Sequence, residues 1–417
     1  MNNKIGIIGI IIVFMFIPLS YGGDDQDTLQ KEYANQAEKL GFPAGRKVLI
    51  LHADDIGMCE ETNIAVIPYL ENQQIQSASV MMPCEYSDEF MQWYKANANY
   101  DIGLHLTLTS EWPTWRWGTV TNKDLVPSLL DSDGFMWSNV WKVVRNAEPE
   151  EVEKEIRAQI AKALSMGTTP THLDTHMGTL YYSDEFLKIF LDIAEEYQIP
   201  ALVFDLSSDS IIEKLEEMDI PITDYLIERC SDYNMPKLDY VCSTPDGNTY
   251  EEFRDNFFEV VRSLNPGITE IIFHPSVESD KLKDIRESWQ RRIVWEAQIL
   301  ADQEVIDFLK EEQIIFTTWK ELMERYFISY VNKDDETCSN STPCYPTIQE
   351  AIDAANYGAN IKIAEGSYDE ALTHSSSKDL ILQGGWDSTF TSQSLTTTVN
   401  SLTITNGSIT VDNLVIQ

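Results

Sequence analysis

Basic residues are scarce in this 417-residue chain, which holds 30 lysines and arginines against 68 aspartates and glutamates. The formal charge of −38 argues against binding to a nucleic-acid backbone, because such binding needs a basic surface. It also argues against docking on anionic membranes, whereas a neutral or cationic substrate is compatible with it. High acidity is equally a means of keeping an exported protein soluble.

Cysteines are also few. The chain has six, too few for a scaffold built on disulfides, and no two are spaced Cys-x-x-Cys, so a thiolate zinc site is not supported. Cys338 and Cys344 lie close together in a polar segment and are a candidate disulfide, although connectivity cannot be read from spacing. The other four are predicted to be small core residues: Cys59, Cys84, Cys230 and Cys242.

The N-terminus carries an apolar run, residues 5–19, between Lys4 and the small residues Ser20 and Gly22. This pattern predicts a secretory signal peptide over residues 1–22, and hence a secreted, periplasmic or cell-surface protein. A retained N-terminal membrane anchor is the alternative, although the run is short for a span and Asp24 follows it.

Residues 26–330 alternate short apolar runs with helical patterns, which predicts an α/β fold of the distorted (β/α) barrel type. Residues 48–51 are apolar without a break and are typical of a strand buried on both faces. The predicted strands are 48–51, 78–82, 101–108, 169–173, 201–206, 240–243, 268–273 and 314–318.

The character of the chain changes after Tyr330. Residues 331–346 are polar and are predicted to be a linker. Residues 347–417 combine a short helix with short strands set off by glycine, asparagine and serine, and they resemble the start of a right-handed parallel β-helix. The chain stops on an apolar strand, so we expect this β-rich segment to be incomplete, or its edge to be covered by a partner.

Five of the six histidines fall at or near the ends of predicted strands: His52, His105, His172, His176 and His274. Asp54 and Asp55 follow the first strand, where ligands bind in α/β folds. One carboxylate with two imidazoles is a common ligand set for a catalytic divalent cation. Each histidine alone is as readily a hydrogen-bonded core residue, but together they indicate a metal site.

Four motifs in order resemble the YdjC-like carbohydrate deacetylases, also called chito-oligosaccharide deacetylases of the ChbG type. The motifs are His52-Ala53-Asp54-Asp55-Ile56-Gly57 with Asn63, Gly103-Leu104-His105-Leu106-Thr107-Leu108-Thr109-Ser110-Glu111-Trp112, Pro170-Thr171-His172-Leu173-Asp174-Thr175-His176, and Phe273-His274-Pro275. The resemblance covers about residues 40–325. It implies a distorted barrel enzyme that uses a divalent metal to remove acetyl groups from N-acetylated oligo- or polysaccharides.

The resemblance also implies roles for residues. Asp55, His105 and His176 correspond to the metal ligands and Asp54 to the general base, with Mg²⁺ and Zn²⁺ both suited to such a set. His176 is preferred over His172 as the third ligand, but the choice stays open. His274, at the end of a late strand, is the candidate acid that protonates the amine leaving group. The remaining predicted site residues are substrate contacts: His172, Trp112, Arg292 and Asn63.

Two other functions remain open on sequence alone. One is a metal-dependent phosphoesterase, although the motifs offer few of the basic residues that it would want near the metal. The other is a catalytically silent glycan-binding or adhesin module, which need not keep both a base and an acid. The oligomeric state is not predicted, and a homodimer is one of the options.

Overall fold

A parallel sheet organised around one long strand is the main feature of the computed structural model, which describes residues 35–417 except 208 and 218. The predicted signal peptide, residues 1–22, lies outside the described residues. Within the described part of the chain, no helix has both the length and the apolar character needed to cross a membrane.

Strand β1 is central because its apolar residues are buried on both faces, as predicted. It pairs in parallel with β6 on one side, while β7 and β2 share the other side along its length. The sheet order is β4-β3-β2-β1-β6-β5, with β7 joined to β1. The strands are β1 (Lys47–Ile56), β2 (Ser77–Val80), β3 (Asp101–Leu106), β4 (Leu173–Thr175), β5 (Tyr240–Ser243), β6 (Gly267–Phe273) and β7 (Ile315–Phe316).

The sheet curls, and residues 201–204 connect its two ends. They form no ladder of their own, but Ala201 bridges to Leu173 of β4, and Phe204 bridges to Leu238 just before β5. The chain therefore has the parallel, barrel-like α/β architecture that the sequence predicts. The predicted strand 201–206 is reduced to these two parallel bridges.

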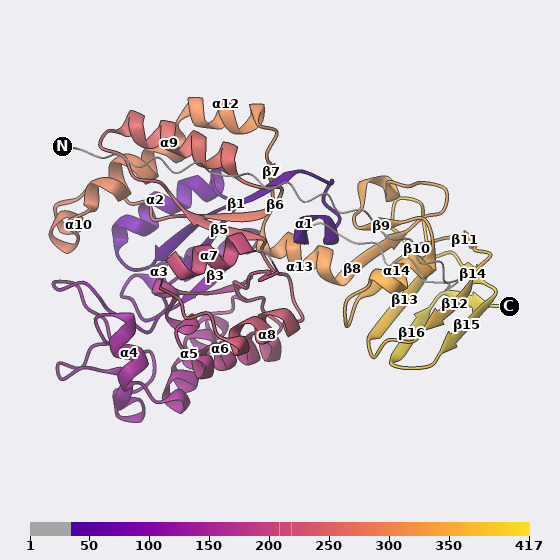
Figure 1. Cartoon of the computed structure of the whole chain (residues 1–417), viewed down its shortest axis with the longest axis horizontal. Coiled ribbons are helices and arrows are strands. Elements are labelled where there is room, and N and C mark those ends of the chain that lie inside the picture. Colours follow the sequence, from indigo (N-terminus) through magenta and orange to yellow (C-terminus); the bar gives the residue numbers. More distant parts are fainter. Residues whose placement is uncertain (1–34, 208, 218) are drawn as a thin grey trace, which may run out of the picture. The chain divides into compact units, whose positions relative to one another are not determined.

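Helices cover the sheet. Figure 1 shows α5, α6 and α8 on one side of it and α9 and α12 on the other. The longest, α5, has Val152, Ile156 and Ile160 buried at a spacing of four, so a single apolar stripe faces the core. The α-helices are α1 (Gln36–Lys39), α2 (Glu60–Glu71), α3 (Ser87–Ala96), α4 (Val140–Asn146), α5 (Pro149–Ser165), α6 (Asp184–Tyr197), α7 (Asp209–Glu217), α8 (Asp224–Asp232), α9 (Tyr250–Ser263), α10 (Asp280–Ile285), α11 (Ala297–Ala301), α12 (Gln303–Glu311) and α13 (Trp319–Phe327).

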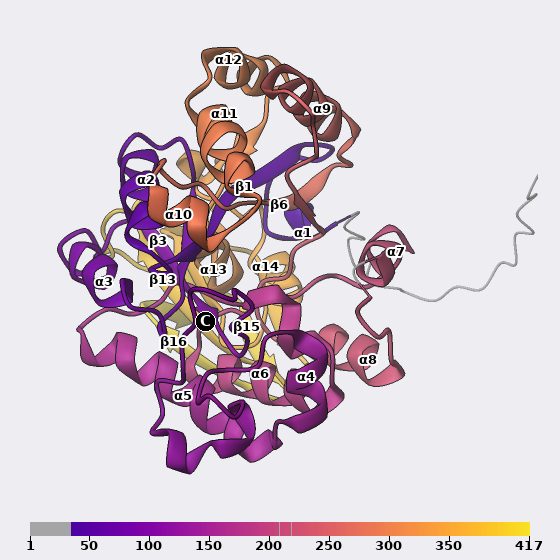
Figure 2. The ribbon, with the colours of Figure 1, turned by 90° about the vertical axis from the view of Figure 1, so that its left-hand side faces the viewer.

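Several shorter helical turns lie beside these elements, and two of them carry site residues. They are the 3-10 helices η1 (Lys123–Leu125), η2 (Pro127–Leu129) and η3 (His176–Tyr181), and the π-helix η4 (Arg291–Glu296). Figure 2 shows α10 and α11 following one another on the same side of the α/β part as α2.

The C-terminal segment is built from parallel ladders between successive passes of the chain. Strand β10 pairs with β13 and β13 with β16, β11 pairs with β14 and β14 with β17, and β12 pairs with β15. These ladders enclose an apolar core of their own. The elements are β8 (Ile328–Val331), η5 (Cys338–Asn340), β9 (Cys344–Tyr345), α14 (Ile348–Ala354), β10 (Asn360–Ala364), β11 (Gly366–Ser367), β12 (Ala371–His374), β13 (Asp379–Trp386), β14 (Thr397–Val399), β15 (Ser401–Ile404), β16 (Ser408–Asp412) and β17 (Leu414–Ile416).

The segment predicted as a linker, residues 331–346, has structure. It holds β9, which pairs with β8, and the disulfide between Cys338 and Cys344 that the sequence suggests. Of the cysteines predicted to lie in the core, Cys59, Cys84 and Cys230 are buried and Cys242 is half-buried.

Candidate active site

The end of β1 bends sharply at two neighbouring carboxylates. Asp55 adopts a φ of 64°, a left-handed conformation that non-glycine residues rarely take, and Gly57 follows with a φ of 81°. A side chain at Gly57 would come within 2.7 Å of the Ser87 backbone, so only glycine fits. Asn63, predicted as a substrate contact, secures this turn: its Oδ1 accepts from the Gly57 N–H at 2.9 Å, and its Nδ2 donates to the Tyr86 carbonyl.

The three predicted metal ligands, Asp55, His105 and His176, converge at this turn. Asp55 Oδ1 lies 3.5 Å from His105 Nε2 and 3.2 Å from His176 Nδ1, and the two nitrogens are 3.1 Å apart. They come from the ends of β1 and β3 and from the start of η3, and all three side chains are buried. Ligands about 2.1 Å from one divalent ion are separated by roughly 3 Å, so these spacings suit such an ion.

The other polar atoms of these ligands are already engaged. His105 Nδ1 lies 2.6 Å from Asp174 Oδ1, and His176 Nε2 lies 3.1 Å from Glu111, which leaves the opposite ring nitrogens facing Asp55. Arg292 Nη2 donates to Asp55 Oδ2 at 2.5 Å, whereas Asp55 Oδ1 is buried without a hydrogen-bond partner. A buried carboxylate oxygen left in this state needs a cation, so the residues present fit a divalent metal.

The charges around Asp55 and His176 shift the pKa values of these two side chains in opposite directions. Burial opposes ionisation of Asp55, but the Arg292 guanidinium and His176 outweigh it and hold the pKa of Asp55 well below its usual range. Burial lowers the pKa of His176, but Glu111 and Asp55 raise it to about 10. The two shifts have opposite causes, because cations beside Asp55 stabilise its ionised form and carboxylates beside His176 stabilise its protonated form.

Asp54, the predicted base, lies beside this cluster with other partners. Its Oδ1 is 3.0 Å from His52 Nε2 and accepts a hydrogen bond from Ser79, and its Oδ2 is 3.8 Å from His105 Nε2. His52 Nε2 is also 3.3 Å from Asp174 Oδ2. Asp55 therefore lies among the ligand atoms, whereas its neighbour Asp54 is held by His52 and the Ser79 hydroxyl.

His274, the predicted acid, is the most accessible of the five histidines. It follows β6, its side chain is 31% exposed, and its Nδ1 lies 3.5 Å from the buried Glu296 carboxylate. The Glu296 carboxylate also accepts the His274 backbone N–H, so the imidazole is anchored on one side and open on the other.

His172 is not brought to the ligand cluster. It is fully buried, its ring stacks on Trp319 at 5.4 Å, and its Nδ1 lies 3.0 Å from the Thr171 hydroxyl. The strand β4 ends at Thr175, and left-handed φ values of 56° at Met177 and 66° at Gly178 turn the chain away. The expected alternation from residue 172 to 176 along one strand therefore does not occur.

The remaining predicted contacts, Trp112 and Arg292, are both buried and lie against one another. Trp112 is 5% exposed, its ring lies 5.9 Å from that of Trp117, and the Arg292 guanidinium lies 5.4 Å from its centre. Arg292 pairs with the buried Asp55 rather than with surface acids. Asp174 orients His105, a role that its place in the histidine motif had suggested. Glu111, which orients His176, was not among the predicted site residues, and its place at the end of the motif that begins at Gly103 was the available signal.

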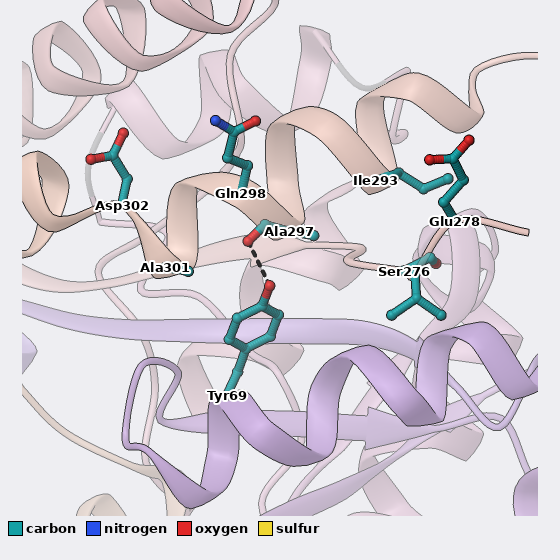
Figure 3. Close-up of a pocket in the computed structure, with 9 residues that line it drawn as sticks. Tyr69, Ser276, Glu278, Ile293, Ala297, Gln298, Ala301 and Asp302 are labelled. Carbon is teal, nitrogen blue, oxygen red and sulfur yellow. Dashed lines mark hydrogen bonds between the residues drawn. The ribbon is translucent and has the colours of Figure 1, made fainter.

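A separate surface pocket lies between α2 and α11, with a volume of about 560 Å³ (Figure 3). The Tyr69 hydroxyl donates to the Ala297 carbonyl at 2.7 Å across its base. None of the predicted site residues lines it, so it is not where the histidines and carboxylates meet. Its lining residues are Tyr69, Ser276, Val277, Glu278, Ile293, Ala297, Gln298, Ala301 and Asp302.

Comparison with known proteins agrees with the sequence motifs. Residues 48–311 match the family described as YdjC-like protein. A carbohydrate deacetylase from Thermoanaerobacter pseudethanolicus is 27% identical over 273 residues, which cover 66% of this chain and 98% of that protein. A carbohydrate deacetylase from Thermus thermophilus is 33% identical over 252 residues, covering 59% of this chain and 85% of that protein.

The fold also has a counterpart among solved structures. A crystal structure of an Enterococcus faecalis protein superposes with a TM-score of 0.55 at 27% sequence identity. The match covers 67% of this chain and 99% of that one.

Proposed function

Because the chain belongs to the YdjC-like protein family, we propose that it is a metal-dependent deacetylase that removes acetyl groups from N-acetylated oligo- or polysaccharides. The relatives described as carbohydrate deacetylases support the reaction class. The single observation that supports metal dependence is the meeting of Asp55 Oδ1, His105 Nε2 and His176 Nδ1, with no other hydrogen-bond partner for that oxygen among the described residues.

The residues divide the chemistry between them. A divalent ion held by Asp55, His105 and His176 would polarise the acetamide carbonyl and acidify water. Asp54 is the base that takes a proton from the attacking water. His52 and Ser79 hold this carboxylate in position from one side.

His274 is the acid that gives a proton to the departing amine. An amine is a poor leaving group until it is protonated, so a donor is needed on the side of the nitrogen. The partial exposure of His274 allows contact with a bound sugar, and the Glu296 carboxylate, 3.5 Å from its Nδ1, holds the ring from the other side.

We further propose the domain organisation suggested by the sequence: an exported protein with a signal peptide over residues 1–22, a deacetylase barrel, and a C-terminal segment that is the start of a right-handed parallel β-helix. The stacked parallel ladders from β10 to β17 support the last of these. Cleavage at the predicted signal peptide is tested by N-terminal sequencing of the exported protein.

Acetate release from N-acetylglucosamine oligomers tests the activity, measured after chelation and after return of Mg²⁺ or Zn²⁺. We expect release to stop with chelator and to return with metal. Asp54→Asn should keep bound metal while losing at least about a hundredfold in kcat, because the base is lost and the three ligands remain.

His105→Ala is the matched variant, since it removes a ligand and should lose the metal itself, as measured by metal analysis of the purified protein. Full activity in Asp54→Asn would refute the base assignment. Activity that is indifferent to chelator and metal would refute metal dependence.

A further inference from the structure

Half of the ten tryptophans of the chain lie in the segment between β3 and α5. Trp112 and Trp117 are buried, and Trp115 and Trp137 are half-buried with their indole N–H groups donated to backbone carbonyls. Trp141 differs, because it is 54% exposed and its indole N–H has no hydrogen-bond partner among the described residues. It is the largest exposed hydrophobic side chain in the described part of the protein.

The register of α4 places Trp141 on the open side of this helix. Val140 and Val143 are buried and face the core, and Trp141 lies about 100° around the helix from Val140. The Asn139 side chain caps the helix by accepting from a backbone N–H of the first turn. A capped helix with an inward apolar side therefore holds the indole outward, so the exposure of Trp141 does not come from an irregular loop.

Trp141 packs against Tyr182. The two ring centres are 5.2 Å apart and the ring planes meet at 85°, the edge-to-face arrangement that aromatic pairs favour. This contact fixes the orientation of the indole, while more than half of the residue stays open to solvent. A ring that is fixed before a ligand arrives can bind it at a lower cost in conformational entropy.

The aromatic pair borders the proposed metal site. Tyr182 directly follows η3, and His176 is the first residue of that helix. A Cβ added at Gly178 would lie 3.8 Å from the Tyr182 ring. Gly178 is two residues from His176, so their Cα atoms are at most about 7.6 Å apart. The open indole of Trp141 therefore lies within reach of a short oligosaccharide whose reacting unit is at the metal ligands.

A sugar ring suits an open indole of this kind. One side of a pyranose presents C–H groups that can lie on the aromatic face, and its hydroxyls can pair with the indole N–H. Such a contact involves no formal charge, so a strongly acidic protein can make it with a neutral glycan. A single exposed apolar residue is ordinary in soluble proteins, but Trp141 is held in place by a second ring and lies beside the proposed reaction centre.

We propose that Trp141, held by Tyr182, stacks on a sugar ring of the substrate other than the one that is deacetylated. The protein then binds glycans of several units more tightly than single sugars. This inference rests on the proposed deacetylase function and adds a binding subsite to it. It also moves the stacking role from Trp112, which is buried, to Trp141.

Isothermal titration calorimetry tests the proposal on the full chain carrying Asp54→Asn, which should hold metal without turnover. The ligands are N-acetylglucosamine, its tetramer and its hexamer. We expect the hexamer to bind at least about tenfold more tightly than the monomer, because it alone gains the aromatic contact in full. The advantage should be the same at low and high salt, since neither the indole nor the sugar is charged.

In the same background, Trp141→Ala should lower the affinity for the hexamer about tenfold and that for the monomer much less, because the monomer is too short to reach both places. Trp141→Phe should keep most of the advantage, since it keeps a ring. Tyr357→Ala is the matched control, because Tyr357 is also 54% exposed but lies in the C-terminal segment. Thermal melting of each variant separates lost binding from lost folding.

Three calorimetric results would overturn the proposal: equal affinities for monomer and hexamer, an equal loss for both in Trp141→Ala, or the same loss in Tyr357→Ala. Sedimentation velocity adds a fourth. If Trp141→Ala changes the oligomeric state and leaves the preference for length intact, the indole is a contact between copies of the chain and not a sugar subsite.

Acetate release from the same ligands by the protein with an intact Asp54 distinguishes the subsite from the reaction. If acetate is released from monomer and hexamer with equal kcat/KM, and Trp141→Ala leaves that ratio as it is, the subsite is wrong and the reaction stands. If the hexamer binds through Trp141 but no acetate is released with any metal, the reaction is wrong and the subsite stands.

Discussion

Glu270 is a buried acid on β6 that the proposed chemistry does not use. Its carboxylate accepts the Trp319 indole N–H at 2.8 Å and lies 3.9 Å from His52 Nδ1. Burial raises the pKa of Glu270 to about 7, with the charges of Asp174 and Asp54 adding to the shift and His52 opposing it. At neutral pH and above, the folded protein therefore holds an unfavourable buried charge.

The pH dependence of stability follows from this raised pKa. The contribution of Glu270 is fully present below its unfolded value of about 4.5 and is lost as pH rises through about 7. Glu270→Gln cannot ionise, so it should lose less stability than the wild type between pH 5 and pH 8, by up to roughly 3 kcal/mol. Urea unfolding at the two pH values measures the difference.

Glu251→Gln is the control for this prediction, because Glu251 is exposed on α9. It should follow the wild type at both pH values. If Glu270→Gln did the same, the buried carboxyl would not be the source of the pH dependence.

The convergence of individual side chains was predictable where the proposed chemistry requires a particular residue type at a strand end. Asp55, His105 and His176 meet this condition and do converge. Asn63 and His172 share the same motifs, but one secures a turn and the other packs on Trp319. Which of these roles a polar residue takes depends on neighbours that are distant in sequence, so a motif alone does not separate them.

At the level of elements, β3 depends on a glycine that lets β4 approach. A Cβ added at Gly103 would lie 2.4 Å from His172 Nε2, and the buried ring cannot move because it stacks on Trp319. Gly103→Ala should therefore destabilise the protein by roughly 1–3 kcal/mol, as overpacking does elsewhere. Urea unfolding measures the effect.

Gly118→Ala is the matched control for this substitution, since its nearest contact would be an ordinary 3.5 Å to the Gly134 carbonyl. It should change stability little. Equal stability of the two variants would show that His172 yields to the added methyl group.

The strands were predicted best where an apolar run ends at a clear polar boundary. The predicted strand 240–243 has the same bounds as β5, and 268–273 differs from β6 by one residue. The predicted strand 169–173 lies mostly before β4, which runs from Leu173 to Thr175. The polar residues Asp174 and Thr175 are buried there by their neighbours in the sheet, and apolar patterning does not reveal that kind of burial.

At the scale of the whole molecule, the α/β part and the C-terminal ladders have separate apolar cores that share no residue. We therefore expect two transitions in scanning calorimetry. Added Zn²⁺ or Mg²⁺ should raise only the one that belongs to the α/β part, because bound metal stabilises the unit that holds it.

Leu372→Ala identifies the other transition. Leu372 is fully buried in the core of the ladders, and its truncation should lower their stability by roughly 2–5 kcal/mol. The metal-sensitive transition should stay in place. A single transition that responds to both the metal and Leu372→Ala would show that the two cores unfold as one cooperative unit.

The carboxylate of Asp174 lies between a proposed metal ligand, His105, and the histidine that contacts the proposed base, His52. One oxygen is 2.6 Å from His105 and the other is 3.3 Å from His52, which in turn contacts Asp54. In the proposed site, the cation affinity of the ligand cluster and the basicity of Asp54 are therefore not independent traits, because a shift of the Asp174 side chain is transmitted to both. Selection for a different ion would also retune proton transfer, so the two properties must change together during evolution.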